Sequence, residues 1–189
     1  GIKFEGTAEI WGDDKCIQAA RGEILFTEYG ISGPPILALS RKVGECFSQG
    51  QEPWLKLNLL DAFDPMELED LLSQRCANGA KKTIAFSCVG LINKQLAPVI
   101  IKEAGVAPDK RAGKLTLPEL KKIAHILQDW RFPVTGTTSW PAAQVTAGGV
   151  DVSDIDNRTM ESKLIPKLYF AGEVLDIDGE CGGYNLQWA

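Results

Sequence analysis

Short runs in which apolar and polar residues alternate dominate the beginning of the chain. Alternation of this kind is typical of half-buried β-strands. It predicts strands over residues 1–5, 8–11 and 22–27, each bounded by glycine or aspartate, and a further strand over 54–59. The first part of the chain is therefore expected to be rich in β-structure.

One short helix is expected to interrupt these strands. A rigid glycine-proline loop over residues 29–35 leads into the apolar stretch 36–41. Pro35 stands near the first helical position, where its fixed φ suits a helix and its missing N–H removes no needed donor. The pattern predicts a short helix that begins near Pro35.

Two segments further on carry complete helix-start signals. Asp64 is followed three residues later by Glu67, and Thr116 is followed in the same way by Glu119. This spacing is the capping box, and apolar residues follow at helical spacing in both segments. Residues 96–104 between them are also predicted to be helical.

The β pattern returns after the helices. It predicts extended segments near residues 132–135, over 143–150 and over 168–172. The chain therefore has an α+β pattern, in which a helical subdomain over residues 62–130 is inserted between β segments.

The composition is that of a globular protein. The chain has 189 residues, of which 44% are hydrophobic and 24% charged, enough for one substantial core or two small ones. Its 25 acidic and 20 basic residues give a net charge of −5, which provides no overall positive field for nucleic acid or anionic lipid. Partners of those two kinds are not expected.

Cysteine and histidine usage bears on location and metal binding. Five cysteines are scattered without a C-x-x-C pair, and His125 is the single histidine. This pattern favours reduced thiols over a disulfide framework and predicts no zinc site. No apolar run approaches the roughly 20 residues of a membrane span, and no signal-like segment opens the chain. The expected location is the cytoplasm.

Glycines next to predicted strand ends are the main candidates for a binding site. Gly172 and Glu173 follow the apolar segment 168–172, where glycine lets a ligand approach the backbone and a carboxylate can accept hydrogen bonds from sugar-like hydroxyls. The alternative is a solvated turn. Gly148 and Gly149 end another predicted strand, and mark either a tight hairpin or a place where the backbone clears a bulky ring.

A second glycine pair opens the last segment of the chain. Gly182, Gly183, Tyr184 and Asn185 have the pattern of a first helical turn whose amides are unobstructed by side chains. Aimed at the pyrimidine edge of a flavin, such an end would stabilise the negative charge of the reduced ring. An ordinary glycine-rich turn is the alternative. Cys181 beside this pair is interpreted as a packing residue rather than a redox thiol.

Together these stretches resemble the bacterial NAD(P)/FAD-dependent flavoproteins that include aminoacetone oxidase-type and bile-acid-reductase-type enzymes. The resemblance lies in motifs that occur in order along the whole chain: residues 22–35, 145–150, 159–163, 168–176 and 182–189.

The resemblance implies a fold and a set of cofactor contacts. It implies a β-barrel-like insert domain at residues 1–61 and 131–164, the helical subdomain at 62–130, and a truncated C-terminal segment of a Rossmann-like FAD domain at 165–189. Gly172 and Glu173 match the second FAD motif, and residues 182–185 match the loop and helix end beside the isoalloxazine. Gly148 and Gly149 match part of the flavin-facing surface.

Two departures from the family pattern limit what is carried over. Glu28 stands where the family commonly has a histidine, so no histidine role is expected there. The chain also contains no G-x-G-x-x-G fingerprint for the cofactor pyrophosphate. The chain is therefore interpreted as a fragment, inactive on its own and not expected to retain FAD.

The predicted function is that of an FAD-dependent oxidoreductase that acts on a small molecule, with NAD(P)H as the candidate reductant. The alternative is a free-standing, non-catalytic binding module. Its motivation is that the sequence presents no assembled histidine base, nucleophile or metal cluster, and no catalytic residue is assigned. Flavin chemistry needs few protein acids or bases, so this absence is weak evidence against an enzyme.

Overall fold

The computed structural model describes residues 1–138, 140–143, 145, 147–179 and 182–189. The chain divides into two compact units, Gly1–Thr135 and Gly136–Ala189, and each is described by itself. Among the described residues, none of the helices has the length and apolar character that crossing a bilayer requires.

The first unit is built on a curled, five-stranded antiparallel sheet that resembles half a barrel. The strand order is β3-β2-β1-β4-β5, and each neighbouring pair is antiparallel. Together with the helices described below, the sheet confirms a mixed α and β fold with a barrel-like part. The strands are β1 (Ile2–Gly12), β2 (Lys15–Thr27), β3 (Gly30–Ser32), β4 (Trp54–Asn58) and β5 (Trp130–Pro133).

The prediction of separate strands over 1–5 and 8–11 was wrong, because β1 runs through Gly6 without a break. A Cβ atom on Gly6 would collide with the carbonyl oxygen of Asn58 on the neighbouring strand β4. The glycine therefore marks a close approach of two backbones and not a turn.

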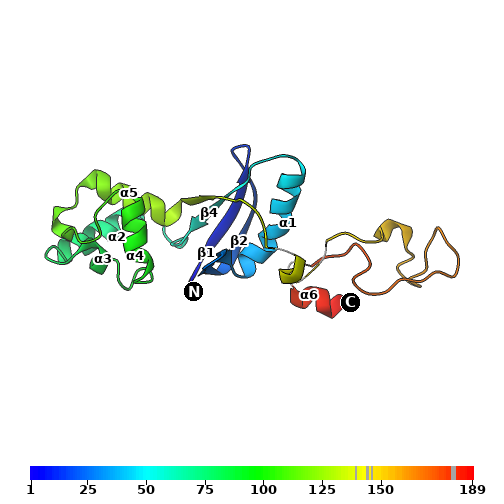
Figure 1. Ribbon diagram of the computed structural model, residues 1–189. Coiled ribbons are helices and arrows are strands. Elements are labelled where there is room, and N and C mark those ends of the chain that lie inside the picture. The colour runs from blue at the N-terminus through cyan, green and yellow to red at the C-terminus, as the bar shows by residue number, and fades with distance from the viewer. Residues whose placement is uncertain (139, 144, 146, 180–181) are drawn as a thin grey trace. The chain divides into compact units, whose positions relative to one another are not determined.

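Helix α1 (Pro34–Ser48) packs against the sheet, as Figure 1 shows. It begins near the predicted position but continues beyond residue 41, because Leu39, Val43 and Cys46 extend one apolar stripe along the helix. These side chains are at most 5% exposed, and Leu39 and Val43 belong to the same core as Ala8 of the sheet.

The remaining helices of this unit gather beside the strands (Figure 1). The two predicted capping boxes are confirmed, at Asp64 and at Thr116. Helix α5 connects the group to the sheet, because Leu59 N donates to Leu127 O at 2.9 Å. The helices are α2 (Pro65–Asn78), α3 (Ile84–Ser87), α4 (Leu96–Glu103) and α5 (Leu117–Gln128), with a 3-10 turn over Ala112–Lys114.

The sequence did not predict α3, which is only one turn long. The Thr83 hydroxyl caps it by accepting from Phe86 N at 3.2 Å. The guanidinium of Arg75 on α2 then donates to two carbonyls at its end, Ser87 O at 2.8 Å and Val89 O at 2.7 Å. Side-chain hydrogen bonds therefore hold this turn where local propensity is insufficient.

The second unit consists mainly of loops. It holds 3-10 turns at Trp140–Ala142 and Val152–Asp154 and the C-terminal helix α6 (Gly182–Trp188). The strands predicted over 143–150 and 168–172 do not form within the described residues. Isolated bridges stand in their place, Val150 with Leu175 and Tyr169 with Glu161. An apolar run becomes a strand only where a neighbouring strand accepts its ladder of hydrogen bonds.

Candidate functional site

Two glycine-containing loops of the second unit lie side by side. Val150 N donates to Val174 O at 2.8 Å, and Asp176 N donates back to Val150 O at 2.9 Å. The Asp176 carboxylate also accepts from Gly148 N at 3.2 Å. The structure thus brings the predicted residues 148–149 next to the segment that follows Gly172.

The three glycines of these loops all have positive φ, for different reasons. Gly149 has φ +152, and a Cβ there would collide with the carbonyl oxygen of Val174 and lie 3.0 Å from Asp176 N. Gly148, with φ +95, has no such neighbour within 4 Å, and Gly172 has φ +80. Close backbone packing therefore requires glycine at position 149, whereas backbone conformation alone favours it at 148 and 172.

Helix α6 is fixed to the preceding loop through one amide side chain. Asn185 is 5% exposed; its Oδ1 accepts from Gly179 N at 2.9 Å and its Nδ2 donates to Gly179 O at 3.1 Å. Asn185 is therefore part of a structural clamp, which the glycine-rich pattern alone did not indicate. Glu173 and Tyr184 are exposed, Tyr184 by 65%.

The C-terminal end of α6 lies close to Gly172. A Cβ on Gly172 would be 4.0 Å from Ala189 O. The indole N–H of Trp188 is buried and has no acceptor among the described residues. Gly182 and Gly183 begin the helix, which has 7 residues and hence a short dipole. Cys181 lies outside the described residues.

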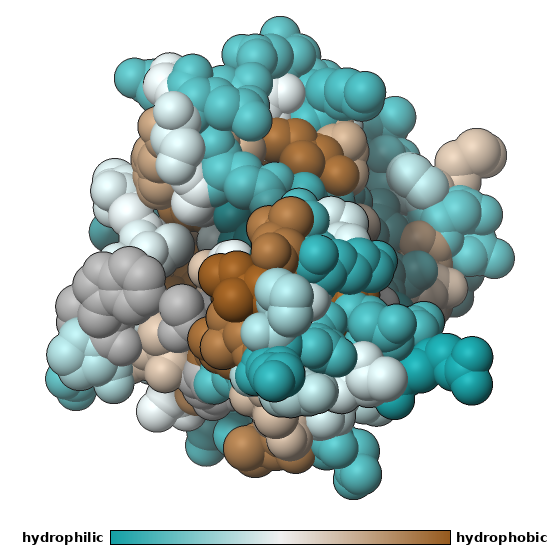
Figure 2. Space-filling view, turned by 90° about the vertical axis from the view of Figure 1, so that its right-hand side faces the viewer, coloured by the Kyte–Doolittle hydropathy of each residue, from teal (hydrophilic) through white to brown (hydrophobic). Residues whose placement is uncertain are grey.

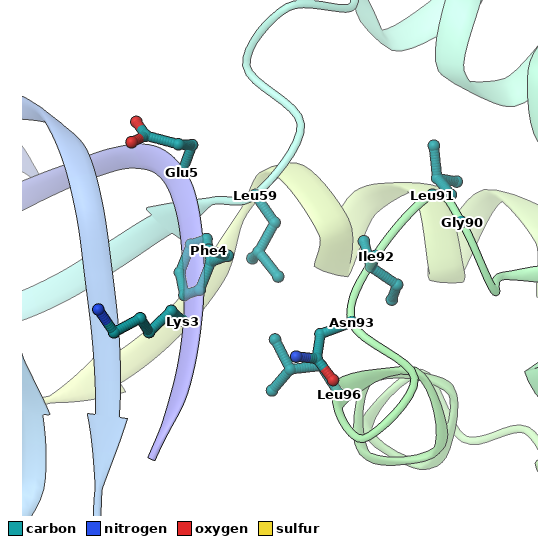
Figure 3. Close-up of a pocket in the computed structure, with 9 residues that line it drawn as sticks. All are labelled: Lys3, Phe4, Glu5, Leu59, Gly90, Leu91, Ile92, Asn93 and Leu96. Atoms are coloured by element: carbon teal, nitrogen blue, oxygen red, sulfur yellow. The ribbon is translucent and has the colours of Figure 1, made fainter.

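A cavity of about 390 Å³ lies within the first unit, between the sheet and the helices. Figure 3 shows Phe4 and Leu59 on the side of the sheet and Ile92 and Leu96 on the side of the helices. Apolar side chains share its lining with Lys3, Glu5 and Asn93, and the Lys3 ammonium is paired with Glu23 at 2.9 Å. The cavity therefore combines apolar contact with one carboxylate and one ammonium group.

Clusters of side chains that could bind a metal ion are absent from the described residues. Within those residues, no three histidine, cysteine, aspartate or glutamate side chains come together as potential ligands. The buried thiols are also poor nucleophiles, because burial raises the pKa of Cys88 to about 11 and raises that of Cys76.

A half-barrel sheet joined to a compact group of helices defines the class of this protein. The chain belongs to the family described as "HI0933-like protein barrel and H2TH domain", whose profile matches residues 1–145. This match covers the sheet, α1 and the helical group, and so accounts for the whole first unit.

Three relatives are similar to this chain over part of their own length. The chain is 34% identical to the ribosomal RNA dihydrouridine synthase of Escherichia coli over 89% of its length and 40% of that protein's. It is 29% identical to the 3-dehydro-bile acid delta(4,6)-reductase of Clostridium scindens, over 89% of this chain and 41% of that protein. A shorter match, 37% identical over 30% of this chain and 46% of the relative, is to small ribosomal subunit protein uS13 of Opitutus terrae. The chain thus spans about two fifths of the two enzymes.

Proposed function

We propose that this chain is the barrel-and-helix part of an FAD-dependent reductase and carries one edge of the FAD site. The observation that carries the proposal is the match to two enzymes with reductive chemistry over 89% of the chain. The match to the Escherichia coli enzyme covers 169 residues, so it extends beyond residues 1–145 of the family profile into the second unit, which holds the glycine loops. These loops are the part of the chain that the resemblance to flavoproteins assigns to the cofactor.

The two enzymes' names have one reaction type in common. Dihydrouridine is uridine whose ring carbon–carbon double bond has been reduced, and a delta(4,6)-reductase removes unsaturation from a dienone. In both, a hydride adds to one carbon of a double bond conjugated with a carbonyl, and a proton adds to the other. Reduced flavin supplies hydrides of this kind. We therefore propose reduction of a conjugated double bond as the reaction class.

The cofactor would be held largely by main chain. The residues assigned to it are Gly148, Gly149, Gly172, Glu173 and the turn 182–185. The glycines lack side chains, which would let a flat ring approach the backbone closely. The Gly148 N–H already donates to the Asp176 carboxylate, so at this position the contribution would be open space rather than a free amide. Because the Asn185 amide is engaged with Gly179, we assign it the shaping of the turn rather than a direct cofactor contact.

The surface of the second unit supports its place in a larger protein. Hydrophobic side chains are visible among polar ones on the face shown in Figure 2. Few apolar side chains of this unit are buried, Ile155 and Leu175 being the examples. An apolar surface of this kind is typical of an interface. The large hydrophobic residues exposed in this unit are Val152, Leu164, Ile165, Leu168, Tyr169, Val174, Ile177, Tyr184 and Leu186.

Two substrate classes are candidates. The sequence favoured a small molecule, and the bile-acid reductase is consistent with that expectation. The distribution of charge favours a nucleic-acid substrate, because residues 75–122 hold ten basic and three acidic residues although the whole chain has net charge −5. The candidate of this kind is a uridine in ribosomal RNA. The matches to a ribosomal RNA enzyme and to a ribosomal protein point in the same direction.

The test is to express the whole gene, including any flanking coding sequence, and record the absorption spectrum of the purified protein. We expect bound flavin that NADH or NADPH bleaches without oxygen. The reduced protein is then given ribosomal RNA from a strain that lacks the gene, or a 3-dehydro bile acid, and the product is examined for a mass gain of two hydrogen atoms. A folded but colourless protein that cannot be loaded with FAD would refute the proposal and favour the non-catalytic binding module.

A further inference from the structure

Two short segments of the first unit, which lie between helices in the sequence, are joined by backbone hydrogen bonds. Residues 80–84 precede and enter α3, and residues 110–114 contain the 3-10 turn before α5. Thr83 and Arg111 form an antiparallel bridge between them. Two backbone hydrogen bonds make this bridge, Ala112 N to Lys82 O at 2.9 Å and Ile84 N to Lys110 O at 2.8 Å, and a third joins Gly113 N to Ala80 O at 3.1 Å.

These segments concentrate positive charge, and their cations are here named the basic edge: Lys81, Lys82, Lys110, Arg111 and Lys114. Neither segment contains an acidic residue. Lys110 is paired with Glu119 at 2.6 Å, but the other four side chains are exposed and have no ion pair within the described part of the chain. Asp109 is the one acidic neighbour in sequence.

Such an arrangement carries a cost for folding. Like charges on directly paired backbone segments repel one another. Most acidic residues of the chain lie outside residues 75–122, and of the five cations only Lys110 forms an ion pair among the described residues. The repulsion between the other four is therefore not relieved by neighbouring carboxylates. Four cations without an ion pair among the described residues, held on two hydrogen-bonded segments, are the electrostatic complement of a polyanion.

An exposed aromatic ring stands next to the basic edge. Phe86 on α3 is 55% exposed, and the Lys82 ammonium lies 4.7 Å from the centroid of its ring. An aromatic face beside cations is a platform on which unpaired nucleic-acid bases stack.

We infer that the basic edge binds the phosphate backbone of a structured RNA and that Phe86 stacks on an unpaired base of that RNA. This contact is separate from the flavin loops and would hold the RNA while the reductase site acts on it. The role of this RNA as substrate rests on the proposed function, whereas binding at the edge needs no flavin. The two are therefore tested separately.

The test measures binding of a fluorescein-labelled RNA hairpin with a uridine-rich loop to the whole protein, by fluorescence anisotropy across a salt series. The triple variant K81Q/R111Q/K114Q removes three exposed cations of the edge. Each phosphate contact contributes roughly 0.8 to the slope of log affinity against log salt. Loss of the three cations should therefore reduce the magnitude of this slope by about 2–3. The affinity near 0.1 M salt should fall on the order of 10²-fold. F86L should weaken binding of the hairpin about tenfold but leave binding of a blunt RNA duplex nearly unchanged.

The matched control is K15Q/R158Q/K167Q, which removes two lysines and one arginine from exposed positions outside the helical group. It should bind the hairpin like the unaltered protein. Equal losses in the two triple variants, or no hairpin binding by the unaltered protein, would overturn the inference. Competition by sodium polyglutamate as effective as that by unlabelled hairpin would also overturn it, in favour of an acidic protein partner. A colourless protein that binds the hairpin as expected would refute the proposed function alone.

Discussion

Replacement of Gly149 by alanine tests whether the two glycine loops are packed as the structure has them. At φ +152, a residue with a side chain costs about 1–3 kcal/mol in backbone strain. The added Cβ also collides with the carbonyl oxygen of Val174, so the loops must separate. Separation of the loops breaks the hydrogen bonds from Val150 N to Val174 O and from Asp176 N to Val150 O, each of which contributes about 0.5–1.5 kcal/mol. The expected total is about 2–6 kcal/mol of local stability.

Gly148 provides the matched control. At φ +95 it carries comparable backbone strain, but no heavy atom lies within 4 Å of an added Cβ. G148A should therefore show the strain alone, and the difference between the two variants, about 1–3 kcal/mol, isolates the cost of separating the loops. G149A should in addition lose FAD from the whole protein more readily than G148A.

Hydrogen exchange at single amides is the suitable assay, because it reports local opening. The reporters are the amides of Val150 and Asp176, which donate the two hydrogen bonds between the loops. Their exchange should be faster in G149A than in G148A by about fivefold to a hundredfold, at 1.4 kcal/mol for each factor of ten. Equal acceleration in both variants, or unchanged exchange in G149A, would show that the loops do not pack against each other at Gly149.

Three further outcomes are expected. Lys110 and Thr116 hold the pKa of Glu119 at about 2, so E119Q should destabilise the protein above the ordinary pKa of 4.5, and the difference in urea unfolding should shrink as pH falls from there towards 2. The Cys88 thiol, with its pKa of about 11, should resist iodoacetamide at pH 8 until the protein is unfolded, as peptide mapping can show. G6A should lower the urea midpoint by more than G44A, because its Cβ meets the Asn58 carbonyl whereas Gly44 has open space.

The elements that the sequence predicted well are those with local causes. The capping boxes at Asp64 and Thr116 contain their own hydrogen-bond partners, so a few residues are enough to place the helix starts. The one-turn helix α3 escaped prediction because it depends on Arg75, which reaches it from another helix. The strand expected over 168–172 failed for the opposite reason, since its pattern was adequate but it found only an isolated bridge at Tyr169.

The candidate site was predictable in its residue types but not in its geometry. Glycine pairs indicated where backbone would be exposed, and the structure brings 148–149 and 172–176 together. Which glycine is sterically required depends on a carbonyl 25 residues away in sequence, that of Val174, and no local pattern contains that information. The engagement of the Asn185 amide by Gly179 was hidden for a similar reason, because only the folded loop brings these two residues into contact.

Net charge was the least informative property of the sequence. A value of −5 for the whole chain combines ten basic and three acidic residues within 75–122 with ten basic and twenty-two acidic residues elsewhere. Screening reduces interactions between exposed charges beyond about 10 Å at 0.1 M salt, so a polyanion at the basic edge responds chiefly to the cations near it. The acidic remainder then acts against binding elsewhere on the surface, because it repels the same phosphates. Under the proposed function, an acidic protein with this basic edge would present RNA in a preferred orientation, as the reduction of one particular base would require.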